Sequence, residues 1–63
     1  MTNVLKETRI KKGLSVAQLA AKSGVTRQTI YNLERDPSRS VKSEIMEALA
    51  SALGVKVGKI FLM

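Results

Sequence analysis

Apolar residues recur every three or four positions along much of this 63-residue chain, which is the spacing of helices that bury one face. The first such segment covers residues 4–12, from Val4 to Lys12. Asn3 is placed to cap this helix, and Gly13 is placed to end it in a left-handed conformation. The residues that we expect to face inward are Val4, Leu5 and Thr8.

Residues 15–35 are the stretch around which the chain is organised, because they predict two short helices joined by a tight turn. Ser15 stands three positions before Gln18, the spacing of a capping box, in which each side chain bonds the backbone N–H of the other residue. The first of these helices should therefore begin at about Val16. It should end at Gly24, because glycine takes a left-handed conformation without steric penalty.

The second of these helices is predicted from Arg27 to about Arg35, with Thr26 as its cap. Pro37 prevents its continuation, since the residue before a proline is pushed out of the helical region. At about 100° per residue, Ile30 and Leu33 share a narrow inward stripe, and the opposite arc is polar. One side of this helix thus packs, while the other presents the side chains of Arg27, Gln28, Tyr31, Asn32 and Arg35.

A fourth helix is predicted from about Val41 or Ser43 to Leu53, and Gly54 ends it. Its inward stripe consists of Ile45, Leu49, Ala52 and Leu53. These segments predict an all-α fold that forms a single domain over residues 1–63.

The amino-acid composition reduces the number of functions that the protein could have. Lysine and arginine number 11 against 5 acidic residues, which gives a net charge of +6 and a pI near 10.2, typical of a protein that binds nucleic acid. The chain has no cysteine and no histidine, so thiolate metal sites and the commonest general base are absent, and an enzyme is the class that we expect least. We expect no metal, cofactor or small-molecule ligand.

The longest apolar runs are shorter than the roughly 18 residues of a membrane span, so we expect a cytoplasmic protein, associated with the nucleoid when bound to DNA.

The chain resembles the helix-turn-helix proteins of the Cro/cI (Xre-like) type, which include repressors of lambdoid phages. The residues that carry the resemblance are Leu19-Ala20, Gly24-Val25, Ile30 and Leu33 in the motif, Ala50 to Val55 after it, and Arg9 to Leu14 before it. The resemblance implies a compact, lambda-repressor-like bundle of five short helices in which the second and third form the helix-turn-helix. Double-stranded DNA is then the partner.

In that fold the third helix enters the major groove of DNA. The base-reading residues implied are Arg27, Gln28, Tyr31 and Asn32. The residues implied to hold phosphates are Ser15, Thr26, Arg35, Arg39 and Lys42. Val16 departs from the family, in which a glutamine often holds a phosphate at that place.

The resemblance also implies a partly buried ion pair between Arg9 and Glu34. Arg9 lies on the inward face of the first helix, one turn beyond Leu5, where an unpaired charge would be costly. In the family, the matching residues tie the first helix to the end of the recognition helix.

The tail after Gly54 fits two structures. The family has a short fifth helix here, in which residues like Val55, Val57, Ile60 and Phe61 complete the core. However, Val55-Lys56-Val57 alternates as a strand does, and Gly58 and Lys59 depart from the family's acidic helix start. The apolar end exceeds what one side of a small core needs, so we expect some of its residues to contact a second protomer in a homodimer. The candidate contacts are Val57, Ile60, Phe61, Leu62 and Met63.

Three functions are compatible with these features. The first is a sequence-specific repressor, of the phage or mobile-element type, that binds a pseudo-palindromic operator. The second is an antitoxin-type protein whose main task is to neutralise or recruit another protein, which the apolar tail and the Glu34-Arg35-Asp36-Pro37 loop favour. The third, a nonspecific packer of nucleic acid, fits less well because uncharged side chains interrupt the basic face at Gln28, Tyr31 and Asn32.

Overall fold

The described part of the chain consists of short helices and one pair of two-residue strands. The computed structural model describes residues 2–62 and contains the helices α1 (Leu5–Lys11), α2 (Val16–Ser23), α3 (Arg27–Arg35), α4 (Ser43–Leu53) and α5 (Val57–Ile60), with the two-residue strands β1 (Thr2–Asn3) and β2 (Phe61–Leu62). The all-α bundle of five helices expected from the sequence is confirmed. None of these five helices is long and apolar enough to cross a membrane.

The capping signals in the central stretch form as predicted. The Ser15 hydroxyl accepts a hydrogen bond from the Gln18 N–H at 3.0 Å, and the Gln18 side chain accepts one from the Ser15 N–H at 2.8 Å. Gly24 ends α2 with a φ of 77°, in the left-handed region. A Cβ atom added at Gly24 would meet nothing within 4 Å, so the backbone conformation, and not lack of space, favours glycine there.

The end of α3 depends on a contact that the sequence did not reveal. In a helix the carbonyl of Leu33 would accept a bond from the N–H of residue 37, but Pro37 has no N–H. The Asn3 side-chain amide donates to this carbonyl, and also to the carbonyl of Pro37, at 3.2 Å each. Its oxygen accepts from the N–H of Leu5 at 3.1 Å, but the N-cap of α1 is Val4 and not Asn3, because the helix begins one residue later than expected.

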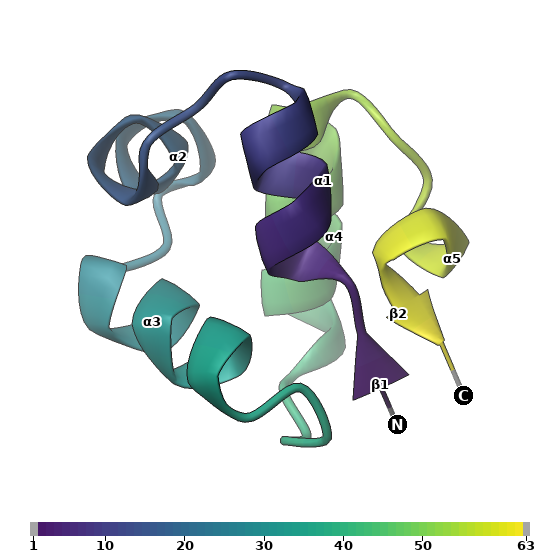
Figure 1. The fold of residues 1–63 in the computed structure, drawn as a ribbon. Helices are drawn as coiled ribbons and strands as arrows, with labels where there is room; N and C mark the ends of the chain where they lie inside the picture. Colours follow the sequence, from purple (N-terminus) through teal and green to yellow (C-terminus); the bar gives the residue numbers. More distant parts are fainter. Residues whose placement is uncertain (1, 63) are drawn as a thin grey trace.

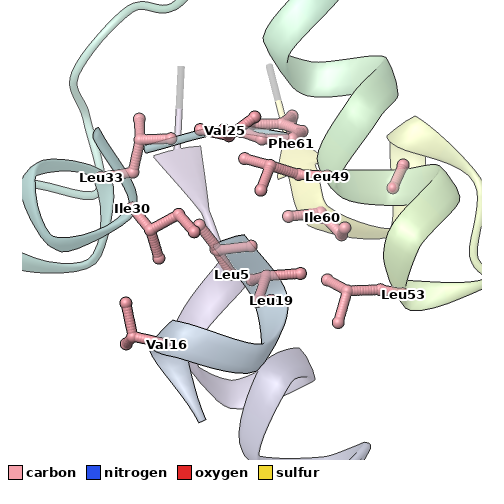
Figure 2. Packing of buried hydrophobic residues seen from close by; sticks show 11 residues of the cluster. Leu5, Val16, Leu19, Val25, Ile30, Leu33, Leu49, Leu53, Ile60 and Phe61 are labelled. Atoms are coloured by element: carbon pink, nitrogen blue, oxygen red, sulfur yellow. The ribbon is translucent and has the colours of Figure 1, made fainter. Parts of the chain in front are cut away.

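One hydrophobic core joins all five helices. Its fully buried large side chains come from every helix: Leu5, Leu19, Ile30, Leu33, Leu49 and Ile60. Figure 1 shows α2 and α3 on one side of α4, and α5 with the strand pair on the other. Figure 2 shows side chains from both sides pointing toward the same interior space.

The inward face of α4 is broader than its predicted stripe. Leu49 and Leu53 are buried as expected, whereas Ile45 and Ala52 are only partly buried. Ala50, which was not predicted, is buried. The cause is that α4 is covered by α2 and by α5, so that more of its circumference is enclosed.

The tail contains both structures that the sequence left open. After Gly54 it forms α5, and then Phe61 and Leu62 pair with Asn3 and Thr2 in an antiparallel register.

The expectation that the tail meets a second protomer is wrong for two of its residues. Ile60 is 0% exposed and Phe61 is 5% exposed, because both fill the core of their own chain. Val57 is partly buried against the same core. Of Leu62 only the backbone pairing is described, and Met63 lies outside the described residues.

We expect the substitution Asn3→Ala to lower the free energy of unfolding by about 1–3 kcal/mol, because it leaves the Leu5 N–H and the Leu33 carbonyl buried without their partner. Urea denaturation measures this change. The matched control is Ser38→Ala, which removes one hydrogen bond in an exposed loop and should change the free energy by less than about 0.5 kcal/mol. Equal denaturation midpoints for the two variants would contradict the role given to Asn3.

Candidate nucleic-acid interface

The helix α3 presents a polar face to solvent. Ile30 and Leu33 are fully buried beneath it, and Thr26 caps its start by accepting a bond from the Thr29 N–H at 3.3 Å. The outward side chains of Arg27, Gln28, Tyr31 and Arg35 are exposed, and Asn32 is partly buried. In Figure 1, α3 lies at the edge of the molecule, where another molecule can approach it.

Three of these side chains are joined by hydrogen bonds. The oxygen Oδ1 of Asn32 accepts from Nε2 of Gln28 at 3.0 Å and from Nη2 of Arg35 at 2.9 Å. Helical periodicity places these residues on one face but does not predict that they bond to one another. Their separations of four and three positions, which bring side chains together on a helix, were the available signal.

Tyr31 stands at the border between α3 and α1. Its exposed ring lines a shallow hollow together with Lys6, Arg9, Glu34 and Arg35. Of the expected base-reading residues, Tyr31 thus lies closest to the side on which α3 is fastened to α1.

The helices α1 and α3 are joined by an ion pair between Arg9 of α1 and Glu34 of α3. Arg9 Nε lies 2.7 Å from Glu34 Oε2, and a second bond runs from Arg9 Nη2 to Glu34 Oε1 at 3.1 Å. The two side chains are only 12% and 8% exposed. The hydrogen bonds to Glu34 raise the pKa of Arg9 above its ordinary value, although burial opposes this shift, so the guanidinium stays charged.

Arg9 has a third partner. Its Nη1 donates to the carbonyl of Leu14 at 2.8 Å, immediately before the Ser15 cap of α2. One guanidinium therefore contacts both the end of α3 and the segment that leads into α2.

The expected phosphate-binding residues lie on three different segments. The hydroxyls of Ser15 and Thr26 are engaged in helix caps as acceptors, and the Thr26 hydroxyl also forms a hydrogen bond of 2.9 Å with the Thr29 hydroxyl. Arg39 and Lys42, in the segment after α3, line a hollow that also contains Thr29 of α3. Val16, where the resembled family often has a phosphate-binding glutamine, is buried and serves packing.

The described residues offer no group of acidic side chains that could hold a metal ion. The exposed polar face of α3, flanked by basic side chains, is suited instead to a polyanion with hydrogen-bonding edges.

The comparison with known families agrees with this geometry. The model of a helix-turn-helix family matches residues 5–60, which covers all five helices. No solved structure gives a significant match to the chain.

We expect Arg9→Ala to lower the free energy of unfolding by about 3–5 kcal/mol, because it leaves the Glu34 carboxylate buried without its counter-charge. The melting temperature should fall by more than about 10 °C. Lys6→Ala, which removes an exposed cation from the same helix, is the control and should melt close to the parent protein.

A double variant separates the ion pair from the packing around it. Replacing both partners with apolar residues, Arg9→Met with Glu34→Leu, should recover most of the lost stability, since neither charge is then buried alone. An Arg9→Ala variant that melts within a few degrees of the parent protein would show that the pair contributes little.

Proposed function

The chain belongs to the helix-turn-helix family of the Cro/cI type, whose members are DNA-binding regulators, and on this basis we propose that it is a repressor that binds a pseudo-palindromic operator as a homodimer. The observation that carries the proposal is the exposed polar face of α3. The ion pair of Glu34 with Arg9 attaches this helix to α1. The proposed unit is a single DNA-binding domain over residues 1–63.

In the proposed complex α3 enters the major groove and its outward side chains read base edges. Arginine pairs in bidentate fashion with O6 and N7 of guanine, which suits Arg27 at the exposed start of α3. Gln28 donates only one of its two amide N–H groups to Asn32, so it retains an N–H and an oxygen for the N6 and N7 edge of adenine. Each such pair discriminates between bases by roughly 1–3 kcal/mol.

The DNA backbone would be held by groups around this face. The helix dipole and the first-turn amides of α2 favour a phosphate beside Ser15, and the hydroxyl of Thr26 lies at the start of α3. Arg35, Arg39 and Lys42 supply positive charge at the other end of α3 and in the segment that follows it. With a net charge of +6, binding should weaken steeply as salt is added.

We propose that the dimer forms mainly on DNA. Ile60 and Phe61 are used inside the chain, and in the part of the chain that the structure describes the exposed large hydrophobic side chains are Ile10 and Tyr31. So little apolar surface favours a weak association of free protomers. Two protomers on one duplex would place their α3 helices about 34 Å apart, one helical turn of DNA.

The burial of Ile60 and Phe61 also bears on the antitoxin-type alternative, because these two apolar residues of the tail are used inside the chain and give no reason to expect another protein as the main partner. The neighbouring genes distinguish the two functions. An oppositely oriented regulator gene favours a phage-type or mobile-element repressor, and an adjacent toxin gene favours the alternative.

Selection of bound sequences from a random duplex library should return one site with two-fold symmetry and half-sites 10–10.5 base pairs apart, as two α3 helices on one face of DNA require. Sedimentation should show free monomers at tens of micromolar and two protomers on the selected duplex. A single protomer on that duplex would contradict the dimer. Equal affinity for every duplex at all salt concentrations would instead indicate a nonspecific packer.

We expect Gln28→Ala and Arg39→Ala to weaken DNA binding in different ways. Gln28→Ala should cost about 1–3 kcal/mol on the selected site and relax the base preference at one position of each half-site, because it removes a base contact. Arg39→Ala should weaken binding to all sequences alike and reduce the slope of log affinity against log salt by about one per protomer. Fluorescence anisotropy titrations over a salt series measure both effects. A uniform loss for both variants would remove Gln28 from the base-reading set.

A further inference from the structure

The hydrogen bonds on α3 fix which atom of Asn32 faces which neighbour. Arginine can only donate, so the Asn32 atom that lies 2.9 Å from Nη2 of Arg35 has to be the acceptor oxygen Oδ1. The Gln28 atom 3.0 Å from the same oxygen then has to be its amide nitrogen. The orientation of both amides therefore follows from the presence of an arginine at position 35.

This arrangement changes what Asn32 can offer to DNA. An amide oxygen has two lone pairs, and those of Asn32 are taken by Gln28 and Arg35. What remains is the amide NH₂ group, which only donates. A free asparagine reads adenine by donating to N7 while its oxygen accepts from N6, and Asn32 cannot do this while both bonds are in place.

We infer that Arg35 is a specificity-determining positioning residue, which makes Asn32 a hydrogen-bond donor that selects a keto base, thymine or guanine, over adenine. Thymine O4 and guanine O6 are acceptors in the major groove, whereas adenine has a donor, its N6 amino group, at the corresponding place and can accept only at N7. This inference rests on the proposed function, because it concerns the bases that α3 reads.

The same arginine can still contact the DNA backbone. Arg35 uses one of its five N–H donors for Asn32, and the others remain for a phosphate. Asn32 is partly buried, which restricts its side chain, while Gln28 and Arg35 reach it from exposed positions on either side along the helix. A phosphate held by Arg35 would therefore support the orientation of Asn32 instead of competing with it.

The test compares Arg35→Met, which removes the donor but keeps a long side chain, with Arg39→Met as the matched control. Both variants lose one exposed arginine, but Arg39 makes no hydrogen bond to Asn32 among the described residues. Sites are selected from a random duplex library with the wild type and both variants. Asn32→Ala identifies the position that Asn32 reads, as the one at which the base preference disappears.

The wild type should prefer thymine or guanine over adenine at that position by about tenfold. Arg35→Met should shift this preference toward adenine by about tenfold and leave the other positions unchanged, because the released Asn32 oxygen can then accept from N6. Arg39→Met should retain the wild-type preference at every position while binding all sites more weakly.

Two results overturn the inference, and they differ from each other. If Arg35→Met weakens binding but selects the wild-type site, Arg35 is a phosphate contact only, and the proposed repressor function stands. If the wild type itself enriches no sequence, the proposed function fails and the inference fails with it.

Discussion

The orientation of α3 depends on the ion pair between Arg9 and Glu34. The buried stripe of α3 is narrow, with Ile30 and Leu33 as its fully buried residues, and apolar contacts of this kind are not directional. The ion pair is directional, because two parallel bonds join the planar guanidinium to the carboxylate. It therefore fixes the rotation of α3 about its own axis, and with it the side chains that point outward. Since Arg9 also holds the Leu14 carbonyl, the entry to α2 is set by the same side chain.

A second constraint acts at the same C-terminal end of α3, where the Asn3 amide compensates for a proline. Pro37 stops the helix and deprives the Leu33 carbonyl of its usual partner, and the Asn3 amide replaces it. The backbone N–H of Asn3 adds a bond of 2.9 Å to the Pro37 carbonyl. The C-terminal end of α3 is thus held both by the start of the chain and by α1. Such fixing suits the proposed role of α3, in which its exposed side chains meet base edges in a defined register.

The features that could be predicted from the sequence are those set by neighbouring residues. The capping box of Ser15 and the turn at Gly24 each involve residues only a few positions apart, so their spacing was sufficient. The pair of Arg9 with Glu34 spans 25 positions and was expected only through resemblance to a family.

The features that could not be predicted depend on tertiary packing or on side-chain rotamers. The contact from Asn3 to Leu33 spans 30 positions. The pairing of Phe61 with Asn3 is another such feature, because helical periodicity does not show it. On α3, the periodicity predicted the outward face, but several pairs there have a spacing that permits a bond. The rotamers of Gln28 and Arg35 decide that both bond to Asn32.

The pairing of β1 with β2 also has a consequence for how the protein is made. Thr2 lies opposite Leu62, so β1 has no partner until β2, about 60 residues later in the chain, has been synthesised. Ile60, which completes the core, arrives at the same late moment. The helix-turn-helix is synthesised early but cannot be fully supported until then, because contacts between distant parts of a chain form only after the intervening segment exists. Completion of the fold, and with it the ability to hold DNA, is therefore tied to the end of translation of this segment.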